Sequence, residues 1–256
     1  MTKPTLQRRS IAASLFFFVL LILNPLPGMS AAENETIPAT RFASTELVKG
    51  APPGWALERK AGTANLRLEK DGGDFVVRLV SDQKSSFGIK RKLCVDLKEY
   101  PILNWRWKTT RLPHGGDVRK AATDDQAVQL YVAFPPTGFP AAFNTPIIGY
   151  VWDNEAPRGW TGRSDQIGGG KLRYMVVRNK TDRVGEWYTE RRNLYDDFRK
   201  LFPDLKGVDT VTVGLQLHIN SQHTKSDAEG WIGDVFFSRQ DTKGMTASAA
   251  TFPVTE

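Results

Sequence analysis

Short segments in which apolar and polar residues alternate constrain the fold of this chain more than any other feature. Every second residue is apolar between positions 127 and 134, and again between positions 211 and 219. A period of two residues is typical of a strand that buries one face. Further segments with strand character lie at 66–69, 75–80, 103–107, 147–152, 174–178 and 231–237. So many short strands predict an all-β fold of two packed sheets, a jelly-roll-like β-sandwich.

One stretch predicts a helix. Residues 189–202 place Leu194, Phe198 and Leu201 at helical spacing, and Pro203 ends the run because proline cannot continue a helix. We therefore expect one short helix near residues 189–202 beside the strands.

The first residues have the layout of a secretory signal. A basic stretch from Lys3 to Arg9 precedes an uncharged, mostly apolar run from Ile11 to Leu23, and small residues follow at 30–32. A helix that spans a bilayer needs about 20 apolar residues, so this run is short for an anchor. We expect cleavage after Ala32 and a bacterial protein that is periplasmic or secreted. An uncleaved N-terminal anchor is the alternative.

The rest of the chain predicts a single domain. We expect a flexible lead-in at 33–45, one β-sandwich domain at 46–239 and a flexible tail at 240–256. No other run is long enough to span a membrane once the signal is removed. The single cysteine, Cys94, excludes an internal disulfide, and we expect it to be a small buried hydrophobe.

The charge of the chain does not favour nucleic acid as a partner. Residues 1–32 hold three basic and no acidic residues, so their removal lowers the net charge from +7 to +4. The remaining basic charge is mild and spread along the chain, which is unlike the basic patch of a nucleic-acid-binding protein.

Motifs of the common enzyme classes are absent. The sequence holds no G-x-S-x-G elbow, no H-E-x-x-H and no Walker lysine loop. Its three histidines are scattered, which does not favour a zinc site. We expect no metal and no cofactor. A hydrolase built on carboxylates, or a lyase, leaves no short motif, so whether the chain is an enzyme stays open.

Two clusters in the first half of the chain have both a structural and a functional interpretation. Arg106 lies in a predicted strand between two tryptophans, where it either forms an ion pair or points into a site. Asp117, Arg119, Asp124 and Asp125 follow in a Gly-containing stretch. They could form an ion-pair network that fixes a loop, contact a substrate, or bind Ca²⁺, which prefers six to eight oxygen ligands.

Two clusters in the second half also carry polar chemistry. Glu190 and Arg192 either cap the predicted helix or reach into a cleft. In the segment 211–219, alternation places the odd-numbered residues, Val213 among them, on the inner face. The outward row then consists of amides and an imidazole. Such groups form hydrogen bonds with sugar hydroxyls, and a nearby aromatic ring offers a flat apolar surface to the sugar ring. This polar face would hold Gln216, His218 and Asn220 together with Gln129 and Tyr131.

Several motifs follow one another along the chain. They are Pro101-x-Leu103-x-Trp105-x-Trp107, Leu112-Pro113-x-Gly115-Gly116-Asp117-x-Arg119, Asp124-Asp125-Gln126-Ala127, Tyr150-Val151-Trp152, Glu190-x-Arg192-Asn193, and the run from Gln216 to Thr224 with Ala228-Glu229. In this order they resemble a bacterial family of unknown function, DUF3047. The resemblance covers roughly residues 40–238 and implies an exported β-sandwich protein, with no activity or catalytic residues to transfer.

Three functions are compatible with the sequence. The first is an exported β-sandwich that binds a carbohydrate or a similar polyhydroxylated envelope ligand on one polar sheet face. The residues of this face would be Arg106, Gln129, Tyr131, Gln216, His218 and Asn220. The second is a polysaccharide hydrolase or lyase of sandwich fold that uses Asp124 or Asp125 with Glu190. The third is a non-catalytic envelope interaction protein in which the polar clusters only brace the fold.

Overall fold

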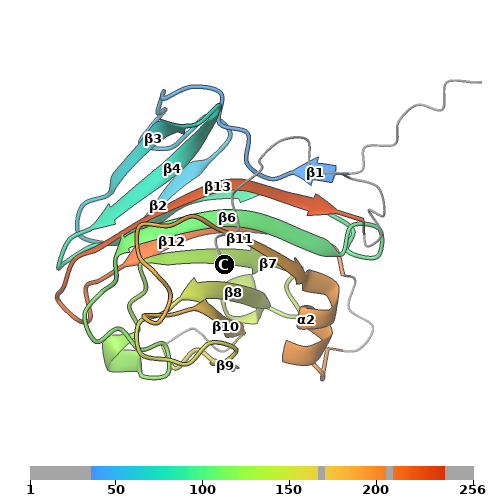
Figure 1. Cartoon of the computed structure of the whole chain (residues 1–256). Helices are drawn as coiled ribbons and strands as arrows, with labels where there is room; N and C mark the ends of the chain where they lie inside the picture. The colour runs from blue at the N-terminus through green and yellow to red at the C-terminus, as the bar shows by residue number, and fades with distance from the viewer. Residues whose placement is uncertain (1–35, 167–170, 206–209, 240–256) are drawn as a thin grey trace, which may run out of the picture. The chain divides into compact units, whose positions relative to one another are not determined.

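The chain folds into two β-sheets. The computed structural model describes residues 36–166, 171–205 and 210–239, and Figure 1 shows the two layers of strands. The six-stranded sheet has the order β11 (Tyr188–Asn193), β6 (Ile102–Arg111), β13 (Ala228–Ser238), β4 (Asp74–Ser81) and β3 (Asn65–Asp71), and β1 (Thr36–Pro38) also pairs with β13. The seven-stranded sheet has the order β2 (Ala56–Ala61), β5 (Ser86–Lys92), β12 (Gly214–Asn220), β7 (Val128–Ala133), β8 (Ile147–Trp152), β10 (Leu172–Arg178) and β9 (Thr161–Arg163). The expected two-sheet sandwich is confirmed.

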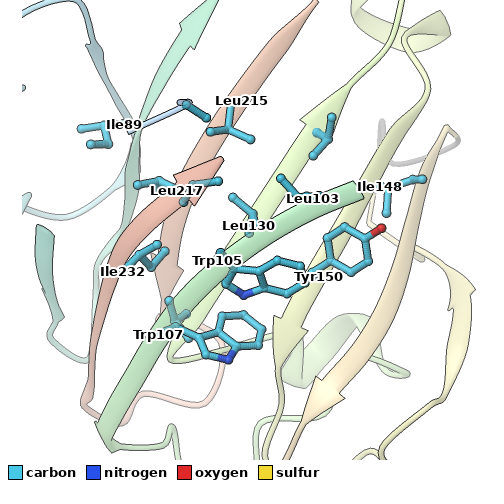
Figure 2. Packing of buried hydrophobic residues seen from close by; sticks show 14 of the residues in the cluster. Ile89, Leu103, Trp105, Trp107, Leu130, Ile148, Tyr150, Leu215, Leu217 and Ile232 are labelled. Carbon is cyan, nitrogen blue, oxygen red and sulfur yellow. The ribbon is translucent and has the colours of Figure 1, made fainter. Parts of the chain in front are cut away.

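Alternation along the strands builds the core between the sheets. Trp105 and Trp107 of β6 point inward and pack against Tyr150 and Trp152 of β8, with ring centroids 5.1 Å apart in the first pair and 5.8 Å apart in the second. Figure 2 shows the two β6 indoles beside Tyr150. All four rings are almost fully buried. Burial of one large apolar side chain stabilises a fold by about 1.5–3 kcal/mol, so this aromatic layer holds the two sheets together.

The predicted helix is shorter than expected. Strand β11 occupies Tyr188–Asn193 and pairs with β6, and helix α2 covers only Leu194–Leu201. The side chain of Asn193 accepts a hydrogen bond from the backbone of Asp196 and so caps the helix. The helical spacing of apolar residues begins only at Leu194, and the residues before it complete the edge of a sheet. Two further short turns of helix are α1 (Ala141–Asn144) and the 3₁₀ turn η1 (Ala121–Thr123).

Three residues differ from the sequence-based expectation of burial. Val213 is 39% exposed and Cys94 is also exposed. Thr212 is fully buried, and its hydroxyl donates to the carbonyl of Leu93 and accepts from the amide of Val95. The strand β12 begins only at Gly214, so the residues before it do not follow its alternation.

Three expectations concern the ends of the chain. Part of the predicted lead-in forms β1, which pairs with β13 and is therefore an ordered strand. The predicted signal at 1–32 and the predicted tail at 240–256 lie outside the described residues. Within the part of the chain that the structure describes, no helix is long and apolar enough to cross a membrane.

Candidate functional site

Five of the predicted ligand-binding residues lie together on the outer face of the seven-stranded sheet. Strands β12 and β7 are antiparallel neighbours, and their register places Gln216 opposite Tyr131 and His218 opposite Gln129. Asn220 follows on the same side of β12, because side chains two residues apart share a face. The apolar residues between them point into the core instead.

These side chains line a cavity on the outer face. Its volume is about 410 Å³, which lies within the range of about 300–1,000 Å³ that is typical of small-molecule sites. Neighbouring strands and loops complete the lining with Lys60, Asp124, Ser164, Gln166, Lys171 and Tyr174.

A glycine on β8 makes room for the aromatic rings of the cavity. Gly149 lies between Tyr131 of β7 and Tyr174 of β10 in the sheet. A Cβ atom at this position would lie 2.6 Å from Tyr131 Cε1 and 3.1 Å from Tyr174 Cδ1. Real side chains do not approach so closely, so the two rings can lie low against the sheet only because residue 149 is a glycine.

The amides at the base of the cavity are held by one another. The Nε2 of Gln129 donates to Gln126 Oε1 at 2.8 Å and to the side-chain oxygen of Asn220. Its Oε1 accepts from the hydroxyl of Tyr131. The Nδ2 of Asn220 donates to the backbone carbonyl of Asp124 and, at 3.0 Å, to Asp125 Oδ1. These donors are therefore already used, and Gln129 and Asn220 fix the floor of the cavity.

The floor carries no charge from its imidazole. His218 is almost fully buried, and burial, together with the nearby Lys60, lowers its pKa to about 3. Its Nδ1 lies 3.1 Å from Gln216 Nε2, and its Nε2 lies 3.2 Å from the hydroxyl of Ser86. Because an amide nitrogen only donates, Nδ1 is the acceptor and the proton is assigned to Nε2. Near neutral pH the imidazole is neutral.

One carboxyl group faces the cavity. Asp124 accepts hydrogen bonds from Gln126 at 2.9 Å and from the Tyr174 hydroxyl at 3.2 Å. Burial raises the pKa of Asp124 above its usual range, and burial also raises the pKa of both Tyr131 and Tyr174. Near neutral pH the two phenols are therefore protonated, and they present hydroxyl groups rather than charges.

Two glutamines keep hydrogen-bonding capacity toward the cavity. Gln216 is half-buried, and no hydrogen bond from the described residues reaches its Oε1. The Oε1 of Gln222 is buried and also lacks a hydrogen-bond partner within the described ranges. A buried acceptor without a partner is rare in native structures. A hydroxyl bound in the cavity could satisfy either acceptor, beside other polar side chains of the lining such as Ser164 and Lys171.

Arg106 does not belong to this face. It lies on β6, in the other sheet, where its guanidinium forms ion pairs with Asp71, at 2.8 Å, and with Asp234. It also lies 4.5 Å from the ring centroid of Trp187. The expectation that Arg106 joins the ligand-binding row is therefore wrong, and the alternative interpretation, an ion-paired strand residue, is confirmed.

The acidic loop is held largely by its own ion pairs and hydrogen bonds. Arg119 donates to both carboxylate oxygens of Asp117, at 2.7 and 2.9 Å, and this contact holds the pKa of Asp117 at about 2. Asp125 is fully buried and accepts from the backbone amide and the hydroxyl of Thr224. In this loop only Asp124 lines the cavity. Among the described residues there is no group of three or more His, Cys, Asp or Glu side chains arranged to hold a metal ion.

Glu190 and Arg192 are engaged elsewhere. Glu190 accepts from Trp107 Nε1 at 3.0 Å and pairs with Arg178 at 2.5 Å. Arg192 donates to both oxygens of Asp197 at 3.0 and 2.6 Å. Glu190 belongs to β11 of the six-stranded sheet, whereas Asp124 faces the cavity on the outer side of the other sheet. The expectation that Glu190 and Asp124 face each other across one groove is therefore wrong.

Sequence reasoning missed several residues of the cavity. Tyr174 lies in a predicted strand, but nothing in that strand shows which neighbour its ring meets. Lys60, Ser164, Gln166 and Lys171 come from strand ends and loops that only the sheet order brings together. No local pattern in the sequence marks these positions. Finding them requires the pairings of β8 with β10 and of β2 with β5, which the sequence does not show.

Comparison with known families identifies the chain at the level of family. The family model described as "Protein of unknown function (DUF3047)" matches residues 54–236. The chain belongs to the DUF3047 family. The match includes both sheets of the fold except β1, and the strands that form the cavity. It confirms the resemblance found in the sequence. No curated protein matches the sequence.

Solved structures of similar fold are distant in sequence. One is the family 11 carbohydrate-binding module of the cellulosomal cellulase Lic26A-Cel5E of Clostridium thermocellum, with 7% identity, a TM-score of 0.43, and coverage of 80% of this chain and 94% of that chain. Another is the xyloglucanase domain of NopAA, a type three effector from Sinorhizobium fredii, with 10% identity, a TM-score of 0.43, and coverage of 74% and 96%. At these identities and TM-scores, neither likeness indicates what this DUF3047 chain binds.

Proposed function

We propose that this protein binds a carbohydrate, or a similar polyhydroxylated ligand of the cell envelope, in the cavity on the outer face of the seven-stranded sheet. The observation that carries the proposal is the chemistry of the lining. Neutral amides, the neutral imidazole of His218, two protonated tyrosines and a single carboxyl group line the cavity, and Lys60, Lys171 and His223 add to this lining.

A lining of this kind matches sugar hydroxyls. A hydroxyl both donates and accepts, so it pairs with an amide, an imidazole or a phenol without needing a charge. Tyr131 and Tyr174 lie with their ring centroids 6.5 Å apart and add flat apolar surface for the C–H faces of a sugar ring. The fixed hydrogen bonds below them keep the site in one arrangement, which lowers the entropy lost when a ligand binds.

The same lining favours binding over hydrolysis. Glycoside hydrolases commonly use two carboxyl groups about 5–10 Å apart. Among the described residues that line the cavity, Asp124 is the only carboxylate. We therefore propose a binding protein rather than an enzyme. We also propose that it acts outside the cytoplasm, in the periplasm or after secretion, as residues 1–32 predict.

Replacement of Gln216 by alanine tests the proposal. This change removes an acceptor that faces the cavity while the buried amides stay in place. We expect an affinity for the bound glycan that is three- to tenfold lower, because one hydrogen bond contributes about 0.5–1.5 kcal/mol. The measurement is calorimetry with whichever soluble polysaccharide, neutral or acidic, retards the protein in affinity electrophoresis.

Gln83→Ala is the matched control, because Gln83 is exposed in the turn between β4 and β5 and does not line the cavity. We expect it to bind as the unaltered protein does. The proposal is overturned if none of the polysaccharides tested by affinity electrophoresis binds, or if the Gln216→Ala and Gln83→Ala variants bind the glycan equally well.

A further inference from the structure

A second hollow continues the cavity along the outer face of the same sheet. Its volume is about 470 Å³. Tyr131, Ile147 and Gln216 line both hollows, so the two adjoin, and together they are called the groove. The groove crosses β5, β12, β7 and β8, which are neighbours in the seven-stranded sheet, and Figure 1 shows β12, β7 and β8 in this order. Two adjoining hollows, each as large as a small-molecule site, suit several linked units of a chain better than a single small molecule.

The second hollow is more apolar than the first. Ala133, Ile147, Val213 and Gly214 form much of its lining, and Val213 is 39% exposed. Such a surface can contact the C–H face of a ring but offers few hydrogen-bonding partners for hydroxyl groups. Specific polar contacts in this half must therefore come from its rim.

Lysines dominate the rim of the whole groove. Lys60 at the end of β2 and Lys171 before β10 line the first hollow, and Lys90 and Lys92 of β5 line the second. Lys90 is paired with Glu58 at 3.0 Å. For Lys60, Lys92 and Lys171, no acidic partner is found in the part of the chain that the structure describes. Three cations thus face the groove without an anion among the described residues to neutralise them.

The acidic side chains do not balance this charge. Asp124 is the only carboxylate in the described lining of either hollow, and it is buried and hydrogen-bonded at the base. Arg91 also borders the second hollow, but its guanidinium donates to the carbonyl of Ala39 and lies over the ring of Trp55. The free positive charge of the groove therefore sits on flexible lysines at its edges, where it attracts anions from solution.

We infer that the ligand is an acidic polysaccharide, whose hydroxyls occupy the first hollow while its carboxylate or sulfate groups lie against Lys60, Lys92 and Lys171. This inference rests on the proposed function and gives it a substrate class. Lysine binds an anion as a point charge with three donors, so it accepts either kind of group. Two carboxylated and two sulfated polysaccharides serve as probes, and they show whether the groove prefers carboxylate or sulfate groups.

The test compares each acidic polysaccharide with a neutral form of the same backbone. The probes are polygalacturonate and alginate with their methyl-esterified forms, and carrageenan and dextran sulfate with their desulfated or unsulfated forms. We expect at least one acidic probe to bind about tenfold more tightly than its neutral form at 0.15 M salt. That preference should shrink at 1 M salt, where the Debye length falls to about 3 Å.

Lysine variants locate the charge effect on the groove. Lys60→Gln, Lys92→Gln and Lys171→Gln should each weaken binding of the acidic probe about two- to fivefold, as expected for exposed ion pairs, and leave the neutral form unchanged. Lys98→Gln is the matched control, because Lys98 is exposed and lines neither hollow. It should bind both forms as the unaltered protein does.

The outcomes separate the two proposals. If neutral and acidic forms bind equally, or if the three groove variants behave like Lys98→Gln, the inference of an acidic ligand is wrong and the carbohydrate-binding function stands. If no probe binds in either form, the proposed function itself is overturned, and this inference with it.

Discussion

The buried imidazole of His218 couples the stability of the site to pH. Its pKa is about 3 in the folded protein, against an ordinary value of about 6.5. As the pH falls below 6.5 the unfolded chain takes up a proton that the folded chain does not. This residue therefore lowers the free energy of unfolding by up to roughly 1.4 kcal/mol for each pH unit, down to about pH 3.

His218→Gln should remove this dependence. We expect the stability advantage of the unaltered protein over the variant to shrink by roughly 1.4 kcal/mol per unit between pH 6 and pH 4, as measured by urea denaturation. The unaltered protein must be compared with the variant at each pH because Asp153 changes the free energy of unfolding with pH in the opposite direction. Burial raises its pKa to about 6, so the stability it provides at low pH is lost as the pH rises from about 4 to 6. A difference between the proteins that does not vary with pH would contradict the assignment.

Single residues also show what the sequence could and could not predict. The alternation along β7 and β12 places Gln129 and His218 on an outward face, and the structure agrees. The same reasoning placed Arg106 outward from its strand, which is also correct, but it put that strand on the wrong sheet. A period of two residues determines the face of a strand. It contains no information about which of two sheets the strand joins.

At the scale of elements, β8 supports the aromatic part of the site through Gly149. We expect Gly149→Ala to destabilise the protein by about 1–3 kcal/mol, because its Cβ would meet two rigid rings on neighbouring strands. It should also weaken glycan binding, because Tyr131 must move to make room. Thermal unfolding and calorimetry measure the two effects.

Gly73→Ala provides the comparison for this element. Gly73 lies in the turn between β3 and β4, and a Cβ there would meet nothing within 4 Å. The stability of the Gly73→Ala variant and its affinity for the glycan should stay close to those of the unaltered protein. If Gly149→Ala binds glycan with unchanged affinity, the two rings do not form the binding surface.

Two of the strands that the sequence missed lie at sheet edges, whereas β5, which was also missed, lies inside the seven-stranded sheet. β2 and β11 are edge strands whose outer sides face solvent, so their sequences are rich in charged residues and show little alternation. Both are strands because a neighbour, β5 or β6, offers them backbone hydrogen bonds. Pairing of this kind joins residues far apart in the sequence, whereas capping and helical spacing are local. The start of α2 was therefore misplaced, although its end was predicted well.

At the scale of the whole molecule, the groove exists only because of the sheet order. β5, β12 and the consecutive pair β7 and β8 lie apart in the sequence and become neighbours in the fold, and their outward side chains meet there. The two-sheet architecture could be predicted from many short alternating strands. The lysine rim could not, because Lys60 and Lys171 carry no pattern that distinguishes them from other exposed lysines until the strands are placed.

Ligand binding should therefore stabilise the domain as a unit. A ligand that binds only the folded state at 100 times its dissociation constant adds about 2.7 kcal/mol to the free energy of unfolding. For a domain of this size the melting temperature should rise by about 5–10 °C. Gln216→Ala loses the hydrogen bond to His218 Nδ1, so without ligand it should melt below the unaltered protein. Its rise at the same glycan concentration should be smaller, whereas Gln83→Ala should show the full rise. Equal rises in both variants would place the bound glycan away from the groove, since only Gln216 faces it.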